Sequence, residues 1–514
     1  MTIDYRIMNK LELNYKVLLE FFFGFSLIIL SSLLALYFVK YQFGGYDLSP
    51  IIDLSWRLKN GEIPGQDFIN TMPLIIILLL KLNIFEHLSW FDLTFLNIIA
   101  VIVTYFSLGI FDDIFDYSVL YSFFVPLVLC IPLVFTNHIW HSSISQYIAI
   151  IFVFTIYISL QKKNKIGFIH FTLIFIFSAL MVTAKQNVSA PFIFATIIYT
   201  ALIKNSNKFS LLSGIIFGAI SGILFVKYIF NMSFYALFYS YYAVVSRGKP
   251  TKEMLEIVFS GTTNQFLVII ILLLCGVLSM TIKKSIFNKS YSYLVLCSFI
   301  SFVPFITDWD SKFNNISLIL FIACLFLCHP EVGIFNKNNN KYPEFIVVLK
   351  AFIISLFVFI YSAAIYGGYS RERMKAVGPF YQIPANLEIK DGYFNGLVTG
   401  QDLFIILKEI KIIKSQFPKE KIFFGPRIEF GYLLTKSKSP ERMPLWWHPG
   451  TSYLIEDQNK IVDDFVKNNF DVLVFFRSDR TRMPYEILNF IESKYIQLEG
   501  TNYTDVYLRE DYLK

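Results

Sequence analysis

A polar stretch of the chain, Gly44 to Leu74, lies between two strongly apolar segments and carries four acidic residues. These residues are Asp47, Asp53, Glu62 and Asp67. Asp47 follows a Gly-Gly pair and stands just before a predicted helix that runs from about Pro50 to Lys59. A carboxylate held there can accept a proton from a hydroxyl or an amine, or bind a divalent ion. We therefore predict Asp47 as a catalytic base and Asp67 as a second candidate.

The same four residues also have simpler interpretations. An Asp just before a helix often serves as its N-cap. Asp67 precedes an apolar run that opens with Pro73, where an Asp commonly forms a turn. Asp53 and Glu62 are most simply charges on the surface of the predicted helix. The residue types alone leave these alternatives open.

Isolated cations stand in two further polar segments. Lys185 and Gln186 interrupt an apolar hairpin, where a charge is costly unless it is functional or paired. Arg247 and Lys249, in the sequence Ser-Arg-Gly-Lys-Pro, form a second basic spot. A Lys can also extend its stem along an apolar surface to reach water, and ordinary solvation in a loop would explain the second spot.

His138 and His141 are three residues apart, so a helix would place them on one face. Together with Asp47 they could form a metal site, because His and Asp are ligands for divalent ions. Asp308 and Asp310 lie in another polar turn and could line the same cavity. Histidines at a membrane edge, together with Trp140, more commonly anchor an apolar segment at its boundary with water.

The composition indicates a membrane protein with several spans. Hydrophobic residues make up 55% of the 514 residues, charged residues only 16%, and the mean hydropathy is +0.56, more than a water-soluble domain of this size needs. The net charge of +7 comes with short Lys clusters between apolar runs, which indicate cytoplasmic loops rather than a nucleic-acid-binding face. All five cysteines lie in apolar segments, so no disulfide framework is predicted.

Apolar runs long enough to cross a bilayer follow one another in the first part of the chain. We place them near 20–40, 91–111, 117–136, 146–160, 168–184, 188–203, 209–229, 264–282, 290–307, 313–329 and 345–366. The apolar run 73–85 is shorter and opens with Pro, so we expect a re-entrant or interfacial helix there. These crossings place every Lys cluster on the side of the N-terminus, which predicts a cytoplasmic N-terminus and an extracytoplasmic C-terminus.

The tail of the chain has a different pattern. Strand patterns at 421–424 and 471–476 alternate with helical patterns at 402–415 and 459–468. We therefore predict an α-helical polytopic membrane protein, with about 11 transmembrane helices and a C-terminal extracytoplasmic α/β domain. The predicted domains are 1–366, whose first outside loop at 41–90 carries the catalytic residues, and 367–514.

Several short motifs are spread along this layout. They are Asp47, Gly61-Glu-Ile-Pro64 with Asp67-Phe68, Met72-Pro73-Leu74, Thr183-Ala-Lys185-Gln186-Asn187, Gly425-Pro-Arg-Ile-Glu-Phe-Gly-Tyr432 and Asp505-Val-Tyr-Leu-Arg509. The combination resembles the C-type (GT-C) glycosyltransferase superfamily, most closely its branch with aminoarabinose transferases and protein O-mannosyltransferases. The chain departs from that pattern at Met72-Pro73, where Pro-Pro is usual. It departs again in the second outside loop, where Asn137, His138 and His141 replace a common acidic residue.

The resemblance implies a GT-C-like fold and an inverting transfer of a sugar from a polyprenyl-phosphate donor. Asp47 would activate the acceptor, and cations would bind the leaving lipid phosphate. Lys185 with Gln186, and Arg247 with Lys249, are the candidates for that second role, because fixed cations stabilise a developing phosphate charge in a medium of low dielectric constant. The implied location is the inner or plasma membrane, and a divalent metal remains an open alternative.

Two other functions stay open at this stage. An O-antigen polymerase or ligase also acts outside on lipid-linked glycans, but its basic residues usually lie in larger middle loops than 230–263. A transporter or flippase would place ionisable residues near mid-span and break helices in paired halves. The sequence identifies neither the sugar nor the acceptor.

Overall fold

The computed structural model describes residues 5–41, 48–82, 89–109, 120–161, 166–205, 207–245, 289–307, 312–328, 343–373, 386–450, 452–477, 483–498 and 501–513. The chain divides into two compact units. The helical unit contains Met1–Tyr37, Thr94–Ile223 and Pro250–Gly368. The loop-and-tail unit contains Phe38–Leu93, Leu224–Lys249 and Tyr369–Lys514. The polar segment between the first two apolar runs therefore belongs to the same unit as the tail.

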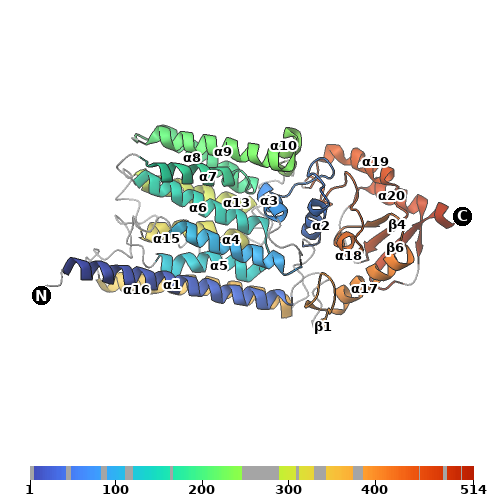
Figure 1. Ribbon diagram of the computed structural model, residues 1–514, viewed down its shortest axis with the longest axis horizontal. Helices are drawn as coiled ribbons and strands as arrows, with labels where there is room; N and C mark the ends of the chain where they lie inside the picture. Colours follow the sequence, from blue (N-terminus) through green and yellow to red (C-terminus); the bar gives the residue numbers. More distant parts are fainter. Residues whose placement is uncertain are drawn as a thin grey trace. The chain divides into compact units, whose positions relative to one another are not determined.

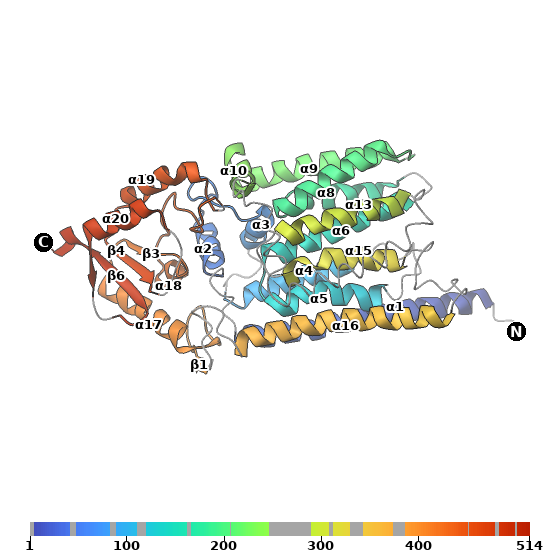
Figure 2. The ribbon, with the colours of Figure 1, turned by 180° about the vertical axis from the view of Figure 1, so that it is seen from behind.

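Long apolar helices build the helical unit (Figures 1 and 2). In the described residues they are α1 (Tyr5–Val39), α4 (Asp92–Gly109), α5 (Val125–Thr136) preceded by the π-helical turn Leu120–Phe124, α6 (His141–Gln161), α7 (Phe168–Met181), α8 (Gln186–Leu202), α9 (Lys208–Phe230), α13 (Lys289–Thr307), the short α14 (Lys312–Asn315), α15 (Ser317–Cys328) and α16 (Pro343–Arg373). Helices suit such a sequence because every backbone hydrogen bond is then made within the segment.

The predicted spans coincide with these helices, except for 264–282, which lies outside the described residues. Five of the described helices are long and apolar enough to cross a membrane: Phe21–Val39, Asp92–Gly109, His141–Gln161, Lys208–Phe230 and Lys350–Gly368. The prediction of a polytopic helical membrane protein is confirmed.

Packing within the helical unit joins segments that are far apart in the sequence. Ser31 of α1 and Tyr361 of α16 share a hydrogen bond of 2.6 Å between their hydroxyls, and the two helices lie side by side in Figure 1. The helix α6 is buried along nearly its whole length. Gly218 of α9 faces α7 so closely that a Cβ added there would lie 2.3 Å from the carbonyl oxygen of Phe175. Small residues permit this backbone contact between membrane helices.

The loop-and-tail unit combines helices from three segments with a small sheet. Its helices are α2 (Leu48–Lys59), α3 (Leu74–Leu82), α10 (Phe234–Val245), α17 (Gln401–Gln416), α18 (Gly431–Thr435), α19 (Gln458–Asn468) and α20 (Tyr485–Lys494), with short 3-10 turns at Ile455–Asp457 and Glu510–Leu513. Its strands are β1 (Leu387–Glu388), β2 (Val398–Thr399), β3 (Ile422–Phe424), β4 (Val472–Phe476), β5 (Tyr495–Leu498) and β6 (Thr504–Arg509). The helix α3 occupies the segment for which we predict a re-entrant or interfacial helix.

The main sheet has the strand order β3-β4-β6-β5. The strands β3 and β4 are parallel, and β6 is antiparallel to both β4 and β5. Between β3 and β4 the chain crosses through α18 and α19, as a parallel pair requires. A buried cluster around Phe423, Phe465 and Leu473 forms the core beside the sheet. The predicted C-terminal α/β fold, including its strands at 421–424 and 471–476, is confirmed.

A tight turn in the loop packs against α10. Gly65 has φ +77°, a left-handed conformation that favours glycine. A Cβ at Gly65 would also lie 2.5 Å from the Cβ of Ala236 in α10. One turn further along the same helix, Tyr239 donates a hydrogen bond of 2.6 Å from its hydroxyl to Asp457 Oδ2. The helix α10 is thus fixed to both the loop and the tail of this unit.

Candidate active site

The helix that follows Asp47 is held by a buried ion triad. Arg57 of α2 donates from Nε to Asp53 Oδ2 and from Nη1 to Glu62 Oε2, each at 2.8 Å. Arg57 is 1% exposed, Asp53 1% and Glu62 8%. The interpretation of Asp53 and Glu62 as surface charges is therefore wrong. Both carboxylates are buried because a guanidinium lies between them and satisfies one oxygen of each.

The triad also connects the loop to the tail. Arg57 Nη1 donates to the carbonyl of Pro440 at 3.0 Å, and Ser439 Oγ donates to Asp53 Oδ1 at 2.6 Å. Trp56 Nε1 donates to the carbonyl of Ser437 at 2.8 Å. Segment 437–440 therefore forms hydrogen bonds with polar side chains in the later turns of α2. The helix cannot shift without breaking several of these hydrogen bonds.

Asp67 lies in the turn that follows α2. Its Oδ2 accepts a hydrogen bond of 2.7 Å from the backbone N–H of Ile63, and its carbonyl accepts one of 2.6 Å from the N–H of Arg442. Beyond it, Ile69 pairs with the tail as a strand residue would. Its N–H donates to the carbonyl of Met443, and its carbonyl accepts from the N–H of Leu445, each at 3.0 Å. In the described structure the Asp67 carboxylate thus has the turn-forming role that we considered for it.

The other predicted site residues of the polar loops fall in segments that the structure does not describe. Asp47, Arg247, Lys249, Asp308 and Asp310 all lie outside the described residues. Asp47 directly precedes Leu48, the first residue of α2.

The first turn of α2 is tied to the tail by a second buried acid. Ser49 Oγ donates a hydrogen bond of 2.6 Å to Glu429 Oε2 and accepts one of 3.2 Å from the backbone N–H of Phe430. Glu429 is 5% exposed and Ser49 is completely buried. Burial raises the pKa of Glu429 to about 8, although its hydrogen bond to Ser49 and the nearby Arg427 favour the charged form. The sequence shows Glu429 only as a single acid among apolar neighbours.

In the helical unit the structure brings Lys185 and His141 together. Lys185 Nζ donates to Ser142 Oγ at 3.3 Å, and that hydroxyl is 3.0 Å from His141 Nδ1. The backbone N–H of Lys185 donates to Ser145 Oγ at 2.8 Å. Lys185 is the N-cap residue of α8, and Gln186 is the first residue of that helix. The amino-terminal ends of α6 and α8 therefore meet, and a helix amino-terminus favours an anion.

His138 lies in the short connection between α5 and α6. Its carbonyl accepts a hydrogen bond of 3.2 Å from Asn97 Nδ2 of α4, and its ring centroid is 5.9 Å from that of Trp140. The rings of Trp140 and His141 are 4.4 Å apart. Within the described residues, no three His, Cys, Asp or Glu side chains come together as a metal site would require. The predicted metal partner Asp47 is outside those residues.

Further polar side chains lie in the same part of the helical unit. Asn187 Nδ2 donates to Thr307 Oγ1 at 3.0 Å, and Gln146 Oε1 accepts from the N–H of Leu318 at 2.9 Å. Among the described residues, Gln146 Nε2 and both amide atoms of Asn315 are buried without a hydrogen-bond partner. The run His-Ser-Ser-Ile-Ser-Gln at 141–146 was the sequence signal for these groups, because polar residues are rare in an apolar helix.

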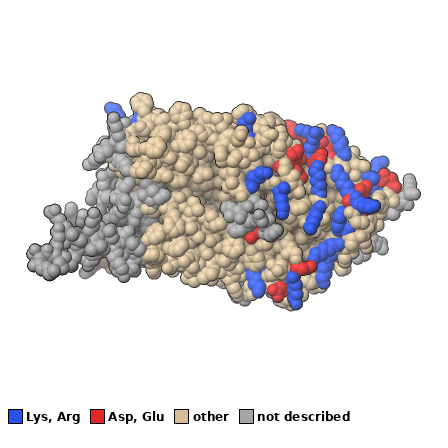
Figure 3. All heavy atoms as spheres, in the orientation of Figure 1, with Lys and Arg blue, Asp and Glu red and all other residues tan. Residues whose placement is uncertain are grey.

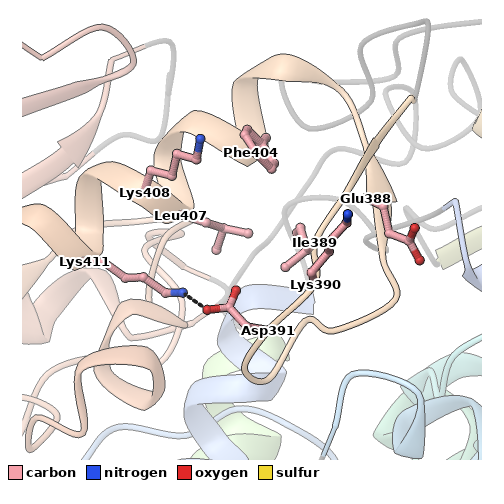
Figure 4. Close-up of a pocket in the computed structure, with 8 residues that line it drawn as sticks. All are labelled: Glu388, Ile389, Lys390, Asp391, Phe404, Leu407, Lys408 and Lys411. Atoms are coloured by element: carbon pink, nitrogen blue, oxygen red, sulfur yellow. Dashed lines mark hydrogen bonds and ion pairs between the residues drawn. The ribbon is translucent and has the colours of Figure 1, made fainter.

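The loop-and-tail unit also has a cavity of about 410 Å³, between the turn after β1 and the helix α17 (Figure 4). Its apolar floor includes Leu407, and its rim carries exposed charges (Figure 4). Lys411 Nζ pairs with Asp391 Oδ2 at 3.0 Å, and Lys408 Nζ lies 4.2 Å from the ring centroid of Phe404. Figure 3 shows many more charged side chains on the visible face of this unit than on that of the helical unit. None of the predicted site residues lines the cavity.

Comparison with known proteins supports the fold. No protein-family model matches the chain, and no curated protein matches its sequence. A solved structure does match: ArnT from Cupriavidus metallidurans bound to undecaprenyl phosphate, with a TM-score of 0.56, 10% sequence identity, and coverage of 94% of this chain and 97% of that chain. The chain has the fold of ArnT. ArnT is a GT-C glycosyltransferase, so the predicted GT-C-like fold is confirmed.

The ArnT-like fold extends across both units, since the match covers nearly the whole of each chain. At 10% identity the likeness concerns the fold and not individual side chains.

Proposed function

We propose that this protein is an integral membrane glycosyltransferase that transfers a sugar from a polyprenyl-phosphate-linked donor to an extracytoplasmic acceptor. The observation that carries the proposal is the ArnT-like fold over 94% of the chain, because the matching structure is that of a glycosyltransferase bound to undecaprenyl phosphate. The loop motifs around Asp47 and Asp67 support the same activity. The acceptor is a lipid, a glycan or a protein.

In the proposed reaction Asp47 takes the proton of the acceptor hydroxyl or amine. The acceptor atom then attacks the anomeric carbon as the bond from that carbon to the phosphate oxygen breaks, which inverts the configuration. The polyprenyl phosphate leaves with the bonding electron pair, and its charge must be stabilised by cations. Asp67 is the second candidate for the carboxylate role, although its Oδ2 accepts the N–H of Ile63 in the described structure.

Lys185 is the proposed cation for the leaving phosphate, with Gln186, Arg247 and Lys249 as further candidates. The described contacts of Lys185 support this role, because its Nζ bonds to the neutral hydroxyl of Ser142 at the amino-terminal ends of α6 and α8. An anion there would gain from the ammonium group and from the helix N–H groups. His138, His141, Asp308 and Asp310 are proposed to line the donor-binding site, which is distinct from the cavity beside α17, and a divalent metal bound among them would further neutralise the phosphate.

The proposed topology follows the Lys distribution. The N-terminus is cytoplasmic and the loop-and-tail unit is extracytoplasmic, in the inner or plasma membrane. This orientation would place the polar loop, the tail and the donor's sugar on one side of the bilayer.

The test is sugar transfer by purified protein from an undecaprenyl-phosphate-linked radiolabelled sugar to extracted envelope lipids and glycans. Asp47→Asn should lose at least about a hundredfold in kcat, since general-base catalysis typically contributes that much. Asp391→Asn, which removes a carboxylate that is 76% exposed in the tail, is the control for loss of an acidic side chain. Full activity of Asp47→Asn would remove Asp47 from the mechanism.

The same preparation separates the alternative functions. Growth of a product ladder from one lipid-linked glycan would support a polymerase or ligase instead. Movement of the lipid-linked sugar across proteoliposomes, without any transfer, would support a flippase.

A further inference from the structure

We propose that Glu429 of the tail is a positioning residue for the first turn of α2, and through it for the catalytic loop. This inference rests on the proposed function only where it concerns activity. The structural part concerns two described residues, Ser49 and Glu429, that are 380 positions apart in the chain.

The hydroxyl of Ser49 both donates and accepts a hydrogen bond in this contact. It donates to Glu429 Oε2 at 2.6 Å and accepts the N–H of Phe430 at 3.2 Å, and water cannot replace either partner because Ser49 is completely buried. Ser49 is the second residue of α2. Helical residues in one turn move together, so this contact holds the first turn of α2 against the tail.

The remainder of α2 is held independently. Its later turns bond to the tail through Asp53, Trp56 and Arg57, which contact segment 437–440. Loss of the Ser49 contact would therefore release the first turn while the helix stays in place. That separation makes a local effect on catalysis measurable without loss of the fold.

The surroundings of Glu429 make its contact with Ser49 sensitive to whether the carboxyl group is protonated. The groups that act on its charge are Ser49 of α2 and Arg427 of its own loop. Tyr432 of α18 also interacts electrostatically with Glu429, and with Asp53 and Arg57. Buried away from water, the protonated carboxyl is favoured, and its pKa is raised to about 8. Ionisation would draw water or a counter-ion to the site and loosen the first turn of α2.

The experiment compares the pH dependence of kcat in the full-length wild type, Glu429→Gln and Asp402→Asn. Gln keeps an oxygen that accepts from Ser49 but cannot ionise. In the wild type we expect kcat to fall by about fivefold between pH 8 and pH 9, as the group ionises, with the donor KM unchanged. Glu429→Gln should lose this fall. Asp402→Asn, another buried carboxyl of the tail whose pKa is raised by burial, should retain it.

A second measurement does not depend on activity. Hydrogen exchange of peptides covering 48–58 should be faster in Glu429→Leu than in wild type at pH 7, within the first turn of α2 only. If wild type transfers sugar but Glu429→Gln shows the same fall in kcat above pH 8, the proposal is overturned and the function stands. If no sugar is transferred, the function fails, and unchanged exchange in Glu429→Leu would then overturn this proposal separately.

Discussion

Replacing Arg57 by Met tests whether the buried ion triad stabilises the loop-and-tail unit. Met has similar length and keeps apolar contacts with Phe68, whose ring centroid lies 4.9 Å from Arg57 Cζ. The change leaves Asp53 Oδ2 and Glu62 Oε2 without their cation. Burial of Asp53 and Glu62 to 1% and 8% exposure prevents water from replacing it.

The expected cost follows from the contacts that are lost. Removing one partner of a buried pair typically costs about 3–5 kcal/mol, because an uncompensated charge stays buried. Here two carboxylates lose the same partner, so we expect the upper part of that range at pH 8. Burial already raises the pKa of Glu62 against the opposing effect of Arg57. Without Arg57 that pKa rises further, so the variant regains stability as the pH falls and the carboxyl group becomes neutral.

The assay is guanidinium unfolding of the detergent-purified protein, followed by tryptophan fluorescence. Of six tryptophans, Trp56, Trp90, Trp446 and Trp447 belong to the loop-and-tail unit. The control is Lys411→Met, which removes the pair with Asp391 whose side chains are 52% and 76% exposed, and should change stability by less than about 1 kcal/mol. Equal shifts for Arg57→Met and Lys411→Met at pH 8 would refute the reasoning.

Two further predictions concern other parts of the molecule. Burial raises the pKa of Glu429 from 4.5 to about 8. The protonated group therefore contributes fully to the free energy of unfolding below pH 4.5, and this contribution is lost as the pH rises through 8. At 1.36 kcal/mol per pH unit, the loss amounts to about 4 to 5 kcal/mol. Unfolding at pH 5 and pH 8 measures this, and Glu429→Gln should flatten the difference; an unchanged slope in that variant would contradict the assignment. Gly218→Ile should separate α9 from α7, because a Cβ there meets the carbonyl of Phe175 at 2.3 Å, and should lower the thermal stability in detergent by several degrees. Gly167→Ile, where a Cβ meets nothing within 4 Å, is its control, and equal melting temperatures would exclude the close contact.

Several predicted features follow from local sequence alone. The spans appear as helices because twenty apolar residues in a membrane protein have few other ways to satisfy their backbone. The runs at 421–424 and 471–476 are strands because short apolar segments between turns suit a buried sheet. The order of short motifs along the chain was enough to indicate the GT-C fold, which the match to ArnT confirms.

The environment of the acids was not predictable in the same way. Asp53 and Glu62 look like surface charges because the tail groups that complete their environment lie more than 370 residues further along the chain: Ser439 donates to Asp53, and the carbonyl of Pro440 accepts from Arg57. The spacing of Asp53 and Arg57, four residues apart, was the one local signal of an ion pair. Lys185 and His141 likewise meet only because α6 and α8 pack with their amino-terminal ends together.

The sequence by itself determined the class of this protein, its spans and its α/β tail, because these depend on hydrophobicity and on periodicity along a continuous segment. The tertiary structure alone decided that the polar loop and the tail form one compact unit, with Arg57 between two buried acids and Ser49 bound to Glu429. The physical reason is that burial and hydrogen bonding depend on which distant segments meet. Local residue patterns carry little information about such contacts.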